Sequence, residues 1–154
     1  LTMSEWIPAD DWETIVANVP IVSVDLLVRY DGGLLLGKRT NEPAKGRWFI
    51  PGGRVQKGET RSEAVHRIGN EELGLDVEIV ESLGPFEHFY ECSDIDGVDT
   101  KHYLANGYIV EAVEGTFQPD DQHTELRVFQ SAPDPLHEYL ETYLKASETF
   151  TGWV

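Results

Sequence analysis

The stretch 51–74 constrains the fold more than any other part of the chain, because a glycine turn is followed by a helix with both ends marked. Residues 51–53, Pro-Gly-Gly, stop a short apolar run and allow the backbone to approach other groups closely. Thr60, with Glu63 three residues later, has the pattern of a capping box, and Gly74 supplies a C-terminal stop. The sequence therefore predicts a short strand, a turn and a helix that begins at Thr60 and ends before Gly74.

Hydrophobic periodicity divides the rest of the chain into short elements. Two further helices are predicted, over residues 8–18 with Pro and Asp in the first turn, and over residues 134–146 with an apolar face. Runs of β-branched and aromatic residues between turn signals predict strands at 20–39 (a hairpin), 48–50, 77–90, 102–113 and 126–129. We therefore expect a single domain over residues 1–154, of α/β or α+β class, with the central helix packed on a sheet.

The charge of the chain limits the classes of partner. Asp and Glu number 28 against 12 Lys and Arg, which gives a net charge of −16. Binding to nucleic acid requires neutralisation of phosphates by Lys and Arg, so polynucleotide partners are not expected. The acidic excess is compatible with an ordinary solvated surface, but it favours adaptation to concentrated salt, where repulsion between the acids is screened. We expect a halophilic protein.

The sequence also carries signals about location. Its apolar runs are all shorter than the roughly 20 residues that cross a bilayer. The first residues, LTMSEWIPADDW, have neither the basic start nor the apolar stretch of a secretory leader. Cys92 is the single cysteine, which rules out an internal disulfide. These features predict a soluble, cytoplasmic protein without a membrane partner.

Acidic residues recur along the predicted central helix. Glu63, Arg67 and Glu71 follow one another at four-residue intervals, so Arg67 is expected to brace the acids on either side. Glu72 lies on the neighbouring face of the helix. Carboxylate oxygens on a rigid helix are suitable ligands for Mg²⁺. The alternative is a pair of surface charges worth only about 0.3 to 0.5 kcal/mol.

Residues 53–75 resemble the Nudix box, G-x5-E-x7-R-E-U-x-E-E-x-G-U, in which U is a bulky aliphatic residue. The resemblance implies a Nudix-type α/β/α sandwich with a mixed central sheet. Two positions depart from the box: Ile68 stands where the box has its first glutamate, and Gly69 stands where it has an aliphatic residue. The missing glutamate is compatible with a dead site or with a subfamily that lacks this acid by design.

Other segments favour the subfamily. VSVDLL, LLLGKRTNEPAKGRWFIPGGRVQKGET, EHFY, KHY and PDDQH resemble GDP-mannose mannosyl hydrolases, in matching order, over residues 16–127. Those enzymes also lack the first glutamate of the box and attack the sugar C1 carbon rather than phosphorus. The resemblance implies a single Mg²⁺, replaceable by Mn²⁺, held by the Gly52 carbonyl, Glu72 and Gln122. Glu71 is acidic where that family has a small residue, so a second role as metal ligand stays open.

The same resemblance implies that His123 is the general base, and the setting of this residue agrees. His123 follows Gln122 in an acidic turn, and the ordinary pKa of histidine lies near neutrality, as a general base requires. The alternative is a solvated loop histidine without a catalytic role.

Five further side chains are implied as substrate contacts. Arg39, Arg54 and Tyr103 would stabilise the departing diphosphate, while Asp25 and His88 would face the rest of the substrate. Arginine forms bidentate contacts with phosphate, and these two arginines flank the glycine turn. Ordinary surface charges are the alternative for both arginines.

Three functions follow from these observations. The first is a hydrolase that converts GDP-mannose to GDP and mannose. The second is a Nudix pyrophosphatase that cuts between the phosphorus atoms of a nucleoside diphosphate derivative, and the third is a nucleotide-sensing domain without turnover. A homodimer is expected from the resemblance and from Trp6 and Trp12, which a small domain does not readily bury.

Overall fold

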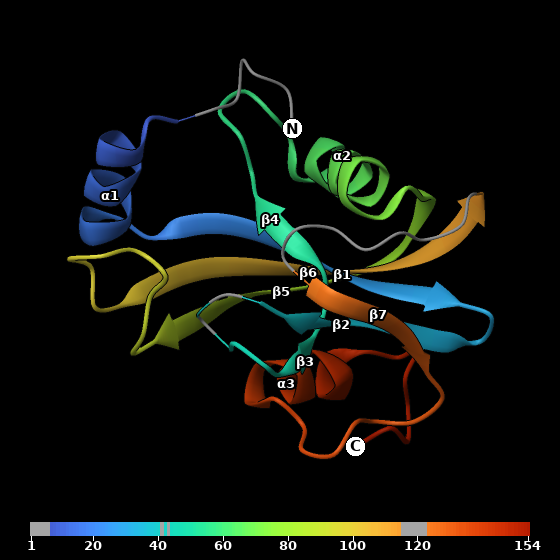
Figure 1. Ribbon diagram of the computed structural model, residues 1–154. Helices are drawn as coiled ribbons and strands as arrows, with labels where there is room; N and C mark the ends of the chain where they lie inside the picture. Colours follow the sequence, from blue (N-terminus) through green and yellow to red (C-terminus); the bar gives the residue numbers. More distant parts are fainter. Residues whose placement is uncertain (1–6, 41, 43, 115–122) are drawn as a thin grey trace.

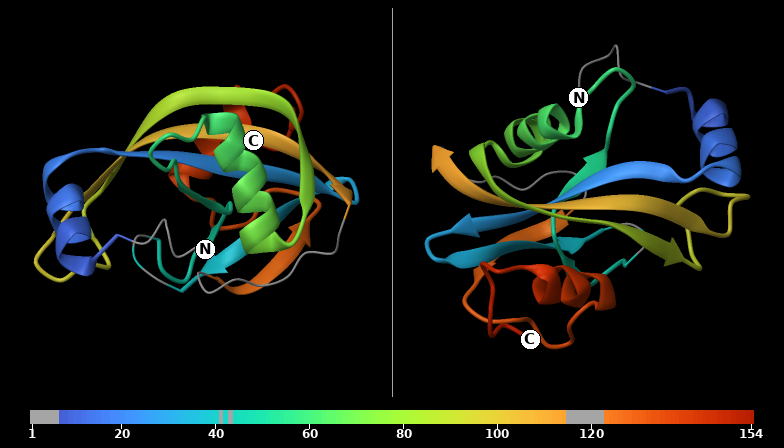
Figure 2. Two further views of the ribbon diagram at one scale, coloured as in Figure 1. Left: turned by 90° about the horizontal axis from the view of Figure 1, so that it is seen from above. Right: turned by 180° about the vertical axis from the view of Figure 1, so that it is seen from behind.

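The computed structural model describes residues 7–40, 42, 44–114 and 123–154 of the chain. A mixed sheet forms the middle of three layers, with α2 (Arg61–Leu73) on one face and α3 (Glu138–Ala146) on the other (Figure 1). The remaining helix, α1 (Ala9–Asn18), lies at one end of the sheet, and both views in Figure 2 show it apart from α2. The predicted α/β/α sandwich with a mixed sheet is confirmed. No helix within the described ranges combines the length and the apolar character needed to span a bilayer.

The sheet contains seven strands in the described part of the chain. These are β1 (Ile21–Tyr30), β2 (Gly33–Arg39), β3 (Trp48–Phe49), β4 (Gly52–Arg54), β5 (Asp76–Tyr90), β6 (Lys101–Glu114) and β7 (His123–Phe129). The main order is β3-β2-β1-β6-β5, while β4 pairs with β1 and β7 pairs with β2. Strands β1 and β6 are parallel, and the other pairs are antiparallel. The predicted strands are all present, although the last one begins three residues earlier than expected.

Side chains on the two faces of β1 enter two separate cores. Leu26 packs beneath α2 together with Val65 and Ile68. Its neighbour Leu27 points the other way and packs against α3 together with Leu140. All five side chains are fully buried, and burial of each contributes roughly 1.5 to 3 kcal/mol. The alternation of a strand thus fixes one helix on each face of the sheet.

The caps of α2 are as the sequence predicts. The Thr60 hydroxyl accepts a hydrogen bond from the Glu63 amide (3.1 Å), and the Glu63 carboxylate accepts one from the Thr60 amide (3.1 Å). At the other end Gly74 has a φ of 70°, and its amide donates to the Asn70 carbonyl (3.1 Å). This conformation favours glycine because it has no Cβ. Both ends of the helix are therefore set by local sequence.

Two further predicted boundaries are wrong. The Pro-Gly-Gly stretch was expected as a turn, but Gly52 begins strand β4, which pairs with Ser23–Asp25 of β1. Glycine permits this pairing, because a Cβ at residue 52 would overlap the Asp25 carboxylate and the Val24 carbonyl. The last helix begins at Glu138 rather than at residue 134, because the His137 side chain caps it by accepting from the Tyr139 amide (3.0 Å).

Gly69, which replaces an aliphatic residue of the box, lies where α2 meets the start of β5. A Cβ at this position would be 3.2 Å from Val77 Cγ2 and 3.3 Å from the Leu75 carbonyl oxygen. The helix therefore packs on the strand at a distance that leaves no room for a larger side chain.

We expect Gly69→Leu to lower the free energy of unfolding by about 1 to 3 kcal/mol, because an overpacked core must shift its backbone. Urea denaturation followed by circular dichroism measures the effect. His66→Leu adds the same side chain to an exposed position of the same helix and should change stability by less than about 0.5 kcal/mol. A Gly69→Leu variant as stable as the wild type would contradict the packing described.

Candidate active site

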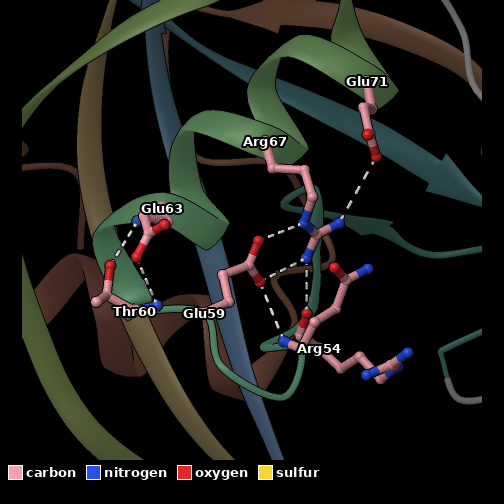
Figure 3. Close-up of polar contacts among 7 residues, drawn as sticks. Arg54, Glu59, Thr60, Glu63, Arg67 and Glu71 are labelled. Carbon is pink, nitrogen blue, oxygen red and sulfur yellow. Dashed lines mark hydrogen bonds and ion pairs between the residues drawn. The ribbon is translucent and has the colours of Figure 1, made fainter. Parts of the chain in front are cut away.

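Arg67 organises the loop between β4 and α2 (Figure 3). Its guanidinium donates to both oxygens of Glu59, from Nε at 2.7 Å and from Nη2 at 3.1 Å, and also from Nη2 to the Arg54 carbonyl (2.9 Å). The Glu59 carboxylate in addition accepts from the Gln56 amide (3.0 Å). Both side chains of this bidentate pair are largely buried, so the loop is held in one conformation.

The partners of Arg67 differ in part from those expected. Glu71 lies 3.8 Å from Arg67 Nη1, as its spacing predicts, but Glu63 is not the second acid. The carboxylate of Glu63 points to the Thr60 amide in the capping box, and Glu59 takes its place beside the arginine. Glu63 therefore forms the capping hydrogen bond with Thr60 instead of the expected ion pair with Arg67.

Glu72 lies over the glycine strand on the α2 face of the sheet. A Cβ added at Gly53 would be 3.9 Å from Glu72 Oε1 and 3.1 Å from Ile68 Cδ1. Because residues 52 and 53 have no side chains, the helix can bring the Glu72 carboxylate close to the backbone of β4. Ile68, at the position of the missing glutamate, is fully buried and belongs to the core.

The oxygens around β4 suit a hard divalent cation. The Glu72 carboxylate, the backbone carbonyls of the two glycines and Glu71, the residue before Glu72 on α2, are the oxygen donors that the chain offers for such an ion. Gln122, the third expected ligand, lies outside the described residues. Within the described ranges, no group of three or more His, Cys, Asp or Glu side chains is placed to hold a metal. The expected set contains at most two carboxylates.

The opposite face of β4 borders a second group of polar residues. Asp25 pairs with Gly52 across the ladder, and its Oδ2 accepts a hydrogen bond from the Tyr143 hydroxyl of α3 (2.7 Å). Burial raises the pKa of Asp25 to about 6, although the Tyr143 hydrogen bond and the charge of Arg39 lower it. At neutral pH the site thus holds a largely ionised carboxylate that a weakly acidic medium would neutralise.

His88 is the second polar group on this face, and it is only 2% exposed. Its ring stacks on Tyr139 of α3, with centroids 3.9 Å apart and planes at 7°. Burial, with a smaller contribution from His137, lowers the pKa of His88 to about 4, so the imidazole is neutral at pH 7. Its Nε2 has no hydrogen-bond partner among the described residues. A buried polar atom of this kind is available to a ligand.

Tyr90 lies at the centre of this face, and the sequence did not single it out. Its ring centroid is 5.3 Å from that of Tyr139 and 5.9 Å from that of Tyr103. Burial raises the pKa of Tyr90, and the nearby charge of Asp25 raises it further, so its hydroxyl remains protonated. Tyr90 stands two residues after His88 in a strand, so it shares the same face. The period-two alternation along EHFY is the sequence signal that could have identified it.

The structure brings some of the expected residues together and separates others. Asp25, His88 and Tyr103 surround Tyr90, and the charge of Arg39 acts on Asp25 and Tyr90 from the end of β2. The Arg54 guanidinium instead lies over the ring of Trp12 in α1, 5.7 Å from its centroid.

The expected base lies at the start of β7. The backbone of His123 pairs with Arg39 in the ladder between β2 and β7. Its side chain, like all of Gln122, falls outside the described part of the structure. The backbone of residue 123 nevertheless lies beside Arg39, at the end of β2.

The loop between β5 and β6 is anchored beside Tyr103. Lys101 is 7% exposed and pairs with Asp94 at 2.8 Å, and its Nζ lies 5.8 Å from the centre of the Tyr103 ring. Val98 of the same loop packs with Val16 of α1. An ion pair to a buried lysine and an apolar contact therefore hold this acidic loop at the edge of the site.

The buried histidines predict a pH-dependent stability. His88 and His137 both have a pKa lowered to about 4 from the ordinary 6.5, chiefly by burial. The unfolded chain therefore binds more protons between these values, and stability is lost as pH falls from about 6.5 to 4. Asp25, whose pKa is raised to about 6, acts in the opposite direction, but two histidines outweigh it.

We expect His88→Phe, which keeps the stacked ring, to lose roughly 2 kcal/mol less stability than the wild type between pH 7 and pH 4.5. Urea denaturation at the two pH values provides the measurement. His66→Phe, at an exposed site on α2, should lose as much stability as the wild type. Equal losses of stability in His88→Phe and the wild type would show that folding does not lower the pKa of His88.

Comparison with known proteins identifies the relatives of this fold. A low-salt glycan biosynthesis protein, Agl8, of Haloferax volcanii is 54% identical over 140 residues, which cover 91% of this chain and 90% of the relative. An ADP-ribose pyrophosphatase of Methanocaldococcus jannaschii is 34% identical over 110 residues, or 71% of this chain and 62% of that protein. The crystal structure of a MutT NUDIX hydrolase from Burkholderia pseudomallei superposes with a TM-score of 0.65 at 28% identity, over 84% of this chain and 98% of the other.

The family assignment agrees with the geometry of α2 and β4. The model of the NUDIX domain matches residues 19–148, which include every strand and both helices that cover the sheet. The bidentate Arg67–Glu59 pair and the carboxylate of Glu72 over Gly53 occupy the positions that the box prescribes. The chain therefore belongs to the NUDIX family of hydrolases.

Proposed function

We propose that this Nudix hydrolase acts on a nucleoside-diphosphate sugar, with GDP-mannose as the best-matched substrate, and releases GDP and free mannose. The observation that carries the proposal is the group of Asp25, His88 and tyrosine side chains on the face of the sheet opposite to Glu72. A carboxylate, a neutral imidazole and aromatic faces suit the hydroxyls and C–H groups of a hexose. The similarity to a protein named for glycan biosynthesis supports a sugar substrate.

The position of Ile68 favours attack at carbon. A box glutamate here would stand beside Gly53, whereas Ile68 is fully buried and offers neither a ligand nor a base. The base is therefore expected elsewhere, and His123 at the start of β7 is the candidate. Water then attacks C1, the C1–O bond breaks with its electron pair passing to the diphosphate oxygen, and the imidazole takes the proton.

The remaining roles follow from position and charge. Arg39, Arg54 and Tyr103 would stabilise the negative charge on the departing diphosphate. The Gly52 carbonyl, Glu72 and Gln122 would hold Mg²⁺, or Mn²⁺ in its place, with Glu71 available as a further ligand. The bound cation would supply positive charge next to the diphosphate.

The setting of the protein is part of the same proposal. A homodimer of a single-domain chain, in the cytoplasm of a salt-adapted cell, is expected from the family resemblance and from the net charge of −16. The substrate is a small molecule, and neither nucleic acid nor a membrane is a partner.

We expect Glu72→Gln to lower turnover on the order of 10²-fold or more, because one charged metal ligand is lost at constant shape. Its melting temperature should stay within a few degrees of the wild type. Steady-state kinetics across Mg²⁺ concentrations provides the measurement. Glu78→Gln makes the same chemical change on the exposed surface of β5 and should leave turnover unchanged. Wild-type turnover of Glu72→Gln at limiting Mg²⁺ would exclude the role.

The bond that breaks is identified by hydrolysis of GDP-mannose in ¹⁸O-water. We expect the label on mannose, released with inverted anomeric configuration, because water displaces the diphosphate directly. His123→Ala should lower turnover by about 10² to 10⁴ with a smaller change in affinity. Mass spectrometry of the products and NMR of the fresh sugar give the two readouts.

Two other outcomes support the alternatives. Label in the nucleotide or in a sugar phosphate would establish a pyrophosphatase, which the similarity to an ADP-ribose pyrophosphatase favours. Lack of turnover with GDP-, ADP- and UDP-sugars in the presence of Mg²⁺ would favour a nucleotide-sensing domain.

A further inference from the structure

Tyr143 of α3 is held in a single position beside the candidate site. Its side chain is fully buried, and a Cβ on Gly107 of β6 would be 2.5 Å from its Cε1. The rings of Phe86 and His88 meet it edge to face, with centroids 5.6 and 5.5 Å away. Only a glycine at residue 107 leaves space for this ring.

The pairing of the strands places this ring next to Asp25. Asp25 has a glycine as its partner on both sides, Gly107 on β6 and Gly52 on β4. The Tyr143 ring occupies the space above Gly107, and its hydroxyl donates to Asp25 Oδ2 at 2.7 Å. The other oxygen, Oδ1, lies against Gly52. The carboxylate is therefore held between helix α3 and the glycine strand.

The hydroxyl of Tyr143 serves Asp25 rather than the packing of the core. A phenylalanine ring would fill the same space against Gly107, whereas a buried hydroxyl is costly unless it has a partner. Asp25 is the hydrogen-bond partner that the described residues provide for it. Burial raises the pKa of Tyr143, so the group remains a donor throughout the pH range of a folded protein.

We propose that Tyr143 is a positioning residue: its hydroxyl orients the Asp25 carboxylate so that the second oxygen is presented to the substrate. The inference rests on the proposed function, in which Asp25 faces the sugar. Tyr143 itself does not touch the substrate. Helix α3, on the face of the sheet opposite to the box helix, is thereby assigned a part in substrate recognition besides its part in the core.

A double-mutant cycle tests the proposal. Tyr143→Phe should lower kcat/KM for GDP-mannose by about ten- to a hundredfold, the usual effect of losing a hydrogen bond to a charged group. Asp25→Asn should lower it at least as much. The double variant should match Asp25→Asn alone, because a residue that acts through Asp25 has no further effect once the carboxylate is gone.

Two matched controls remove a hydroxyl elsewhere. The Tyr139 hydroxyl, one turn earlier on α3, bonds the Phe89 backbone (2.8 Å), and Tyr108 is buried on the α2 face. The effects of Tyr139→Phe and Tyr108→Phe, whatever their size, should multiply with that of Asp25→Asn. A Tyr143→Phe effect that is equally large in the Asp25→Asn background would overturn the proposal and indicate a purely structural role.

The comparison survives an unstable single variant. Tyr143→Phe leaves the Asp25 carboxylate without its hydrogen-bond donor and can fail to fold for that reason. The double variant has no carboxylate at residue 25, so it can still be compared directly with Asp25→Asn. Equal kcat/KM and equal calorimetric affinity for GDP-mannose support the inference, and a further loss contradicts it. Failure of the proposed function is recognised separately, because wild-type protein would then neither turn over nor bind GDP-mannose. That result would also overturn the inference, which requires that Asp25 faces the sugar.

Discussion

The glycine pair of β4 is the constraint on which the site depends. Gly52 faces Asp25 and Gly53 faces Glu72, so two groups on opposite faces of the sheet are separated by two residues without side chains. Any Cβ at residue 52 would displace the Asp25 carboxylate. The Arg67–Glu59 pair holds the following loop and thereby fixes where β4 ends. Helix, loop and strand therefore form one unit.

Burial shifts the pKa of two groups on the α3 face of the sheet. The pKa of Asp25 rises and that of His88 falls, so each group is closer to neutral than it would be in water. The neutral His88 ring therefore offers no positive charge to offset the Asp25 carboxylate in a chain with a net charge of −16. Arg39 adds positive charge at the same place, and its effect on Asp25 shows that the two groups are close.

Local rules predicted the parts of the structure that local interactions determine. The capping box at Thr60, the stop at Gly74 and the strand periods required only neighbours within a few residues. The pairing of β4, the Glu59 partner of Arg67 and the contact of Tyr143 with Asp25 were missed, because each depends on how distant segments meet. Periodicity places Tyr143 on the apolar face of the predicted helix 134–146, and it does not distinguish a core tyrosine from one whose hydroxyl faces a site.

Ile68 and Gly69 show how a departure from a motif acquires meaning from packing. Gly69 is explained by its distance to β5, which leaves no room for a larger residue, so it reflects the core. Ile68 is explained differently, because its side chain lies 3.1 Å from the place where a Cβ of Gly53 would be, at the edge of the candidate metal site. A carboxylate at residue 68 would reach the same backbone that Glu72 approaches. Because residue 68 is apolar, Glu72 is the acid that α2 places beside Gly53. Under the proposed function, α2 would therefore not activate water, and the candidate for that task is His123, whose backbone pairs with Arg39 at the end of β2.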